Sequence, residues 1–211
     1  MKHTPFTHLQ FKELFNLDSE VIAKLLTFEE LLIEWNKKIN LVAGSTLSNI
    51  WWRHILDSAQ TIKLFPANSS VLIDFGSGAG FPGLVFSILG FPEVHLVESN
   101  GKKVKFLSYV IDRLNLKTVV HHTRMESLKP FNVDIITARA VAPLDKLIKL
   151  SYSFVNDKNV QIYLKGESFQ NEIDKAKKLW EIDLLTYKSI TNQNARLLKI
   201  FKCLPIESLN V

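Results

Sequence analysis

Glycines and an acid in the middle of the chain form the pattern with the clearest chemical meaning. The run 71–84 reads VLIDFGSGAGFPGL: an apolar strand that ends at Asp74, a glycine-rich turn and a helix start. Glycines let the backbone turn sharply and approach a ligand that a Cβ would exclude, and a helix start points unsatisfied N–H groups at that ligand. The run therefore predicts a nucleotide-cofactor site. The alternative is a strand-turn-helix junction whose glycines serve only packing.

Two classes of cofactor fit the glycines, and the acid separates them. Residues 78–83, G-x-G-x-x-G, satisfy the dinucleotide fingerprint, whereas residues 74–80, D-x-G-x-G-x-G, satisfy the loop of S-adenosylmethionine-dependent methyltransferases. A carboxylate at the strand end would repel a pyrophosphate but attract a sulfonium and an ammonium. Asp74 therefore favours methyl transfer. Glu98, which closes the strand-like run 94–97, suits a ribose and does not discriminate, because both cofactors carry one.

Length and composition indicate one main domain. The chain has 211 residues, of which 46% are hydrophobic and 22% charged, enough to bury a full core. The net charge of +5 is a weak indication of a polyanionic partner.

The single cysteine, Cys203, excludes an internal disulfide and a cysteine-rich zinc site, and suits a reducing cytoplasm. No apolar run approaches the ~20 residues of a membrane span and no export signal is recognisable, so we expect a cytoplasmic protein with no membrane partner.

The first part of the chain has a helical period. Apolar residues step by four and three over 21–39, and Asp18 is placed to cap this helix. A second helical pattern covers 48–64 and ends before a proline. We expect residues 1–66 to form a small helical N-terminal extension.

Residues 67–211 alternate between short β-rich runs and longer amphipathic segments, as a doubly wound α/β fold does. The expected strands are 70–75, 94–98, 118–122, 133–138 and 160–164, and the expected helices are 82–90, 101–115, 144–155 and 168–180. Two further β-like runs, 182–190 and 195–203, flank a polar turn at 191–194, which predicts a hairpin and an antiparallel last strand. We expect a Rossmann-like, mostly parallel sheet in a methyltransferase domain over 67–211, one compact unit.

Six segments also carry a family resemblance over nearly the whole chain. They are WNKKINLV (35–42), RHILDS (53–58), DFGSGAGFPG (74–83), ESNGKKVKFL (98–107), TARA (137–140) and LKG (164–166). In this order they resemble the bacterial 16S ribosomal RNA guanine-N7 methyltransferases, also called the glucose-inhibited division protein B family. The resemblance implies a class I methyltransferase fold with a helical N-terminal extension, S-adenosylmethionine as cofactor, and a guanine in the decoding region of small-subunit ribosomal RNA as substrate.

The resemblance implies cofactor contacts beyond the glycine-rich loop. Glu126 can accept the exocyclic N–H of an adenine, and Met125 can supply an apolar contact to the same ring. Their alternatives are a helix-start acid and core filler. The full set of expected cofactor-binding residues is Asp74, Gly76, Gly78, Gly80, Phe81, Glu98, Met125, Glu126 and Arg139.

The implied reaction needs no general base, because guanine N7 carries an in-plane lone pair and loses no proton on methylation. Catalysis would come from the alignment of N7 with the methyl carbon and the sulfur, in a site that tolerates positive charge. Arg139, after the fourth strand, can grip a phosphate, guanine O6 or the methionine carboxylate, and its alternative is a surface ion pair. Lys165, at the end of the fifth strand, is a second positioning candidate, and its alternative is a solvated lysine.

RNA contacts are expected from basic residues of the extension and of the segment after Glu98. The candidates are Lys37, Lys38, Arg53, His54, Lys102, Lys103, Lys105 and Lys165. Trp51 fits the apolar stripe of its helix, so we expect it in the core. His121 and His122 are adjacent in a strand and point to opposite faces, so we expect no metal site.

The substrate is constrained by RNA geometry, because N7 lies in the deep, narrow major groove of A-form helices. The target guanine is therefore expected in a loop or bulge. We expect a monomer that acts on 16S ribosomal RNA within a small-subunit particle. Three alternatives stay open: a methyltransferase for a small molecule or a protein, a nicotinamide-dependent oxidoreductase, and a ribosome-assembly factor.

Overall fold

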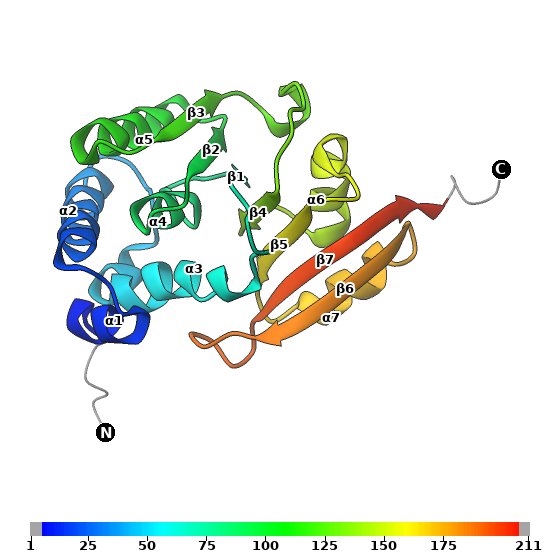
Figure 1. Cartoon of the computed structure of the whole chain (residues 1–211), viewed down its shortest axis with the longest axis horizontal. Coiled ribbons are helices and arrows are strands. Elements are labelled where there is room, and N and C mark those ends of the chain that lie inside the picture. Colours follow the sequence, from blue (N-terminus) through cyan, green and yellow to red (C-terminus); the bar gives the residue numbers. More distant parts are fainter. Residues whose placement is uncertain (1–5, 207–211) are drawn as a thin grey trace.

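A seven-stranded sheet forms the centre of the computed structural model, which describes residues 6–206 (Figure 1). The strands are β1 (Val71–Phe75), β2 (Glu93–Glu98), β3 (Thr118–His122), β4 (Ile135–Arg139), β5 (Val160–Lys165), β6 (Trp180–Lys188) and β7 (Arg196–Pro205). Their order is β3-β2-β1-β4-β5-β7-β6. Strands β1 to β5 are parallel, and β7 is antiparallel to both β5 and β6. The expected mostly parallel sheet with an antiparallel last strand is confirmed.

Helices cover both faces of this sheet. They are α1 (His8–Phe15), α2 (Ser19–Asn36), α3 (Asp57–Ala59), α4 (Gly83–Ile88), α5 (Gly101–Leu114), α6 (Leu144–Ser151) and α7 (Phe169–Ala176). Side chains of α4, α5 and the N-terminal helices form one hydrophobic cluster, and those of α6 and α7 form a second. Successive strand residues point to opposite faces, so Leu72 belongs to the first cluster and Ile73 to the second. The fold therefore has three layers.

The segment predicted as one helix over 48–64 is helical for most of its length, but the type of helix changes along it. It contains a 3₁₀ turn (Gly44–Asn49), a π-helix (Trp51–Leu56), α3 and a second 3₁₀ turn (Ile62–Leu64). Hydrophobic periodicity reports which residues are buried and cannot show an extra residue inserted into a helical turn. Trp51 is buried in the core, as expected, and its Nε1 donates to Glu29 at 2.7 Å.

Helix capping explains two differences near the N-terminus. Helix α1 is absent from the sequence-based elements, yet Thr7 and Gln10 form a capping box at its start. The Thr7 N–H donates to Gln10 Oε1 at 2.9 Å, and the Gln10 N–H donates to Thr7 Oγ1 at 3.4 Å. Asp18 lies at the N-cap position of α2, but its side chain makes no capping hydrogen bond. The predicted capping interaction of Asp18 is therefore wrong.

Two helices of the second half are shorter than expected. The helix expected over 144–155 ends as α6 at Ser151, and a 3₁₀ turn (Tyr152–Phe154) follows. The helix expected over 168–180 ends at Ala176, because Trp180 already pairs with Pro205 in the sheet. Sheet pairing thus overrides the local helical pattern at this end.

The N-terminal helices share a core with the sheet layer. Phe28 of α2 is fully buried, and its ring centroid lies 5.2 Å from that of Phe81 and 6.4 Å from that of Phe106.

The domain boundary predicted at residue 66 stays a prediction, and segments 1–5 and 207–211 lie outside the described residues. Within residues 6–206, every helix is too short or too polar to cross a membrane.

We expect Phe28→Ala to lower the free energy of unfolding by about 3–5 kcal/mol, because it leaves a cavity between α2 and the sheet layer. Urea unfolding measures this loss. Leu14→Ala, at a side chain that is 57% exposed, is the control and should change stability by less than about 0.5 kcal/mol. Similar small effects from both substitutions would contradict a shared core.

Candidate active site

A cavity of about 700 Å³ lies at the carboxyl ends of β1, β4 and β5. Ligands of open parallel sheets bind at such an edge, and the volume suits a small-molecule site. The lining comprises residues 41–42, 53–54, 57, 76–79, 81, 103, 139–143, 164–166, 172, 189, 191–192 and 195–197. It therefore combines the glycine-rich loop with segments from both ends of the chain.

The glycine-rich loop follows β1 and adopts a left-handed backbone. Gly76, Gly78 and Gly80 have φ angles of +65°, +55° and +89°, which glycine adopts without steric cost. The N–H groups of Gly76 and Ser77 both donate to the Val97 carbonyl, at 2.9 and 3.1 Å. A Cβ on Gly78 would meet only the Gly76 carbonyl oxygen, at 3.7 Å, so the space beside Gly78 is open. The loop is thus a cradle that a side chain would fill.

Asp74 is fully buried beneath this loop and does not line the cavity. Its Oδ2 accepts the Gly83 N–H at 3.3 Å, and its Oδ1 accepts the Thr137 hydroxyl at 3.0 Å. Burial raises the pKa of Asp74 to about 7, although these hydrogen bonds oppose the shift. The carboxyl group organises the start of α4, and the direct ligand contact expected from the sequence stays a prediction.

Glu98 also binds the loop from outside the cavity lining. Its Oε2 accepts the Gly78 N–H at 3.0 Å, and its Oε1 accepts the Asn100 N–H at 2.7 Å. The residue is buried at the end of β2. Glu98 therefore couples the loop to the start of α5, and its expected role toward a ribose stays a prediction.

Arg139 lies in the cavity wall and is held by residues 53–57 of the N-terminal segment, which precedes β1. Its Nη1 is 3.2 Å from Asp57 Oδ2 and donates to the Arg53 carbonyl at 3.2 Å. Its guanidinium carbon lies 5.1 Å from the ring centroid of Phe81. The side chains of Arg139 and Asp57 are 17% and 20% exposed. Arg139 therefore forms an ion pair, as its alternative interpretation held, but inside the cavity wall and not at the open surface.

His54 is neutral in this wall. Burial and the neighbouring charges of Arg139 and Arg53 lower the pKa of His54 to about 3. An arginine can only donate, so the His54 Nδ1 accepts from Arg139 Nη2 at 3.0 Å. The ring proton is therefore on Nε2, which donates to Thr46 Oγ1 at 2.8 Å. His54 lines the cavity but brings no positive charge near neutral pH, and its expected RNA contact stays a prediction.

Lys165 lies at the end of β5 and is almost completely buried. Its Nζ donates to the Ala142 carbonyl at 2.6 Å and pairs with Glu172 Oε2 at 2.7 Å. The solvated-lysine alternative is therefore wrong. Arg196 stands opposite Lys165 in the β5–β7 ladder and also lines the cavity. Sequence reasoning missed Arg196, which only the antiparallel strand pairing brings to this edge of the sheet.

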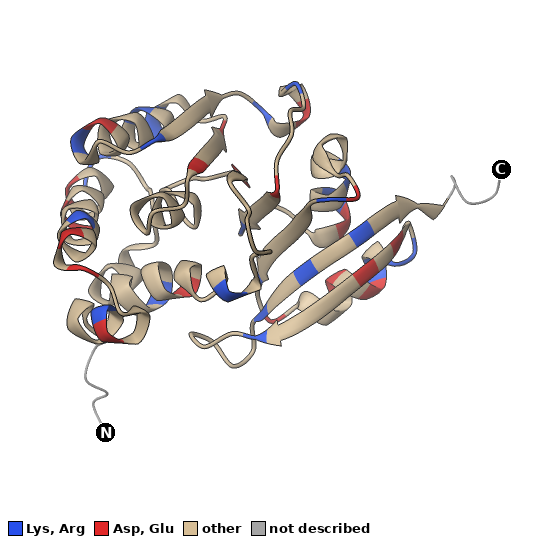
Figure 2. Cartoon of the chain, viewed as in Figure 1, with Lys and Arg blue, Asp and Glu red and all other residues tan. Residues whose placement is uncertain are grey.

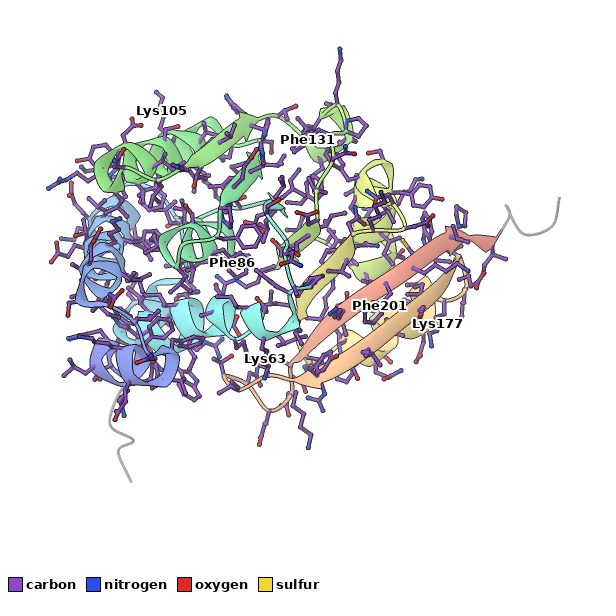
Figure 3. The ribbon with its side chains drawn as sticks, viewed as in Figure 1. Lys63, Phe86, Lys105, Phe131, Lys177 and Phe201 are labelled. Atoms are coloured by element: carbon purple, nitrogen blue, oxygen red, sulfur yellow. The ribbon has the colours of Figure 1, made fainter. Side chains whose placement is uncertain are left out.

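Several other predicted residues lie away from the cavity lining. Met125 is buried in the cluster beneath α6, as its core-filler alternative expects, and Glu126 is exposed. Their cofactor contacts stay predictions. Of the basic candidates, Arg53 and Lys103 line the cavity, whereas Lys37, Lys38, Lys102 and Lys105 are exposed outside it. Figure 2 shows Lys and Arg along α5, and Lys105 lies on the outer side of that helix (Figure 3).

The histidines of β3 have different neighbours. His121 Nε2 lies 2.9 Å from His95 Nδ1, whereas His122 is exposed near Gly101. Within residues 6–206, the side chains of His, Cys, Asp and Glu form no group of three or more that could hold a metal ion.

A sequence model of the family described as rRNA small subunit methyltransferase G matches residues 21–199. The chain belongs to this family. Ribosomal RNA small subunit methyltransferase G of Rhodospirillum centenum is 39% identical over 200 residues, which cover 95% of this chain and 93% of the relative. The protein of the same name from Bartonella henselae is 41% identical over 197 residues, 90% of each chain. The family resemblance carried by the six sequence segments is confirmed.

Two solved structures, one with S-adenosylmethionine bound and one of a methylase, share the fold of this family member. A mutant of MtNAS in complex with S-adenosylmethionine has a TM-score of 0.58 at 15% identity and covers 94% of this chain and 84% of its own. The ribosomal protein L11 methylase from Lactobacillus delbrueckii subsp. bulgaricus has a TM-score of 0.55 at 18% identity and covers 68% of this chain and 75% of its own. These likenesses concern the fold alone, and they confirm the expected class I methyltransferase fold.

We expect the stability difference between the wild type and Asp74→Asn to depend on pH. The folded state holds the Asp74 proton more tightly than the unfolded state, because its pKa is raised to about 7. The free energy of unfolding of the wild type should therefore fall relative to the variant as the pH rises from 5 to 7, by up to about 1.4 kcal/mol per unit. Urea unfolding at pH 5, 6 and 7 measures the difference, and a constant value would contradict the raised pKa.

Proposed function

We propose that this chain transfers the methyl group of S-adenosylmethionine to N7 of a guanine in the decoding region of 16S ribosomal RNA. The observation that carries the proposal is the presence, in one cavity, of an open glycine cradle and a set of cationic side chains. Membership in the rRNA small subunit methyltransferase G family supports the substrate class.

The glycine-rich loop suits the cofactor. S-adenosylmethionine, when bound, supplies an electrophilic methyl group on a sulfonium. Gly78 leaves the backbone accessible in the cavity, Gly76 gives room to the Val141 side chain, and Phe81 provides an apolar surface beside them. Asp74 and Glu98 hold the loop in this conformation, because they accept the N–H groups of Gly83 and Gly78.

The remaining cofactor residues act at the edges of the site. A Cβ on Gly80 would collide with the Leu84 side chain, so glycine lets the loop close onto α4. Met125 and Glu126, which follow β3, contact the adenine in our proposal. In our proposal Arg139, which lines the cavity, binds the methionine carboxylate or an RNA phosphate.

The protonation states in the cavity fit a reaction without a general base. His54 is neutral and its Nδ1 is occupied by Arg139. The carboxylates of Asp57 and Glu172 are both paired with cations. Since methylation at N7 releases no proton, these groups serve to orient the reactants, and alignment of N7 with the methyl carbon and sulfur supplies the rate enhancement.

The cationic side of the cavity suits RNA. Arg53, Lys103, Arg139, Lys165 and Arg196 line the cavity and favour a polyanion. The exposed lysines Lys37, Lys38, Lys102 and Lys105 extend the RNA contact in our proposal. We further propose that the enzyme acts as a monomer in the cytoplasm, on a guanine presented by a small-subunit particle.

We expect Gly78→Leu to weaken S-adenosylmethionine binding by roughly a hundredfold or more, because the new side chain takes the space of the ligand. Isothermal titration measures the affinity. Gly90→Leu is a matched control, since Gly90 has a φ of +92°, open space for a Cβ and no place in this cavity. Gly90→Leu also places a leucine at a positive φ, and this variant should bind normally. Equal affinities for the two variants would contradict a cofactor site in the cradle.

The function is tested by incubating the protein with methyl-labelled S-adenosylmethionine and small ribosomal subunits from cells that lack the enzyme. We expect the label in 7-methylguanosine after digestion of the RNA. Label in another nucleoside would overturn the proposed target atom. Label in a protein or a small molecule, with none in RNA, would favour that alternative substrate class. No methylation despite cofactor binding would favour an assembly factor.

A further inference from the structure

A buried hydrogen-bond cluster joins the N-terminal segment to the loop between β6 and β7. Gln60, just after α3, is 2% exposed, and Ser189 and Thr191 of the loop are 8% and 9% exposed. The Gln60 Nε2 donates to Ser189 Oγ at 3.1 Å, and its Oε1 accepts the Ile190 N–H at 2.7 Å. Both ends of the Gln60 amide therefore hold the loop.

Asp57 ties this loop to Arg139. One carboxylate oxygen, Oδ1, accepts the Thr191 hydroxyl at 2.5 Å and the Gln60 Nε2 at 3.0 Å. The other oxygen, Oδ2, accepts from Arg139 Nη1 at 3.2 Å. Trp52 Nε1 also donates to the Thr191 carbonyl, at 3.0 Å. A single carboxylate thus links the end of the central strand β4 to the loop between β6 and β7 at the edge of the sheet.

The loop and the glycine cradle lie at different ends of the cavity. The cradle follows β1 and the loop precedes β7, and the sheet order places β4 and β5 between these strands. Three strand spacings separate them by about 15 Å. If the cradle holds the cofactor, the loop faces the space that is left for the acceptor, the substrate that receives the methyl group.

The loop and the first residue of β7 carry donors that suit an RNA acceptor. Asn192 of the loop and Arg196 of β7 line the cavity, and amide and guanidinium N–H groups match the oxygen acceptors of base edges and phosphates. Arg196 Nη1 also donates to the Gln193 carbonyl of the loop at 2.8 Å. Asn192 Oδ1 accepts the Asn194 N–H at 3.0 Å, which orients the Asn192 side chain. These donors are useful only if the loop holds one position.

We propose that the clasp formed by Asp57, Gln60 and Thr191 holds residues 189–195 as the acceptor-binding wall of the cavity. Asp57 is then a positioning residue that sets this wall relative to Arg139. The inference rests on the proposed function, because it takes the acceptor to be RNA. It predicts that removing a hydrogen bond of the clasp raises the KM for the RNA substrate and leaves the Kd of S-adenosylmethionine unchanged.

Thr191→Val tests the clasp, because it removes the hydroxyl that Asp57 accepts at nearly constant side-chain volume. Thr191→Ser keeps a hydroxyl and is the rescue variant. Thr186→Val, at an exposed residue of β6, is the matched control. The readouts are kcat and KM for small ribosomal subunits at saturating S-adenosylmethionine, the Kd of S-adenosylmethionine, and hydrogen exchange of the loop amides.

We expect Thr191→Val to raise KM for the subunits roughly tenfold, the effect of one lost hydrogen bond to a charged group. The Kd of S-adenosylmethionine should stay within about twofold, and Thr191→Ser and Thr186→Val should keep the wild-type KM. Asp57→Asn, which also removes the charge that faces Arg139, should lower kcat in addition.

An unchanged KM in Thr191→Val, with faster exchange of the loop amides, would overturn the inference and leave the clasp a purely structural device. An equal loss of RNA use and of cofactor affinity would also overturn it, because it would indicate general destabilisation. Absence of methylation by the wild type would overturn the proposed function, and the inference with it, before any variant is compared.

Discussion

Two buried carboxyl groups, Asp74 and Glu98, accept the N–H groups of Gly83 and Gly78, and the site depends on this arrangement. The bonds hold a backbone that only glycine adopts without strain, and they do so from below, outside the cavity lining. The loop can therefore present bare backbone to a ligand. The cost is a carboxyl group at Asp74 whose pKa is raised to about 7 by burial.

The order of the strands decides where the loop faces a cavity. β1 and β4 are neighbours, and the segments that follow them diverge, β1 toward α4 on one face and β4 toward α6 on the other. A crevice at the carboxyl ends results, as at the switch point of other open parallel sheets. The N-terminal segment and the β6–β7 loop then enclose this crevice, and Asp57 bonds to both Arg139 and Thr191.

Local sequence patterns predicted most of the fold because they report burial and chain reversal directly. The run before Asp74, the amphipathic period of α5 and the polar turn before Arg196 all have their expected structures. The patterns failed where a long-range contact or a cap decides the outcome. The π-helix over Trp51–Leu56 leaves no periodic signal, and α7 ends early because Trp180 pairs in the sheet. The capping box of Thr7 and Gln10, by contrast, is a local signal that the sequence itself carries.

The sequence by itself determined the family, the strand-loop-helix unit at Asp74 and the residue types available for chemistry, because each rests on neighbours in the chain. Tertiary structure decided what those residues do. It buries Asp74 beneath the loop, makes His54 neutral by burying it against Arg139, and brings Arg196 beside Lys165. Burial and long-range charge change a side chain's protonation and partners, and neither can be read from spacing alone.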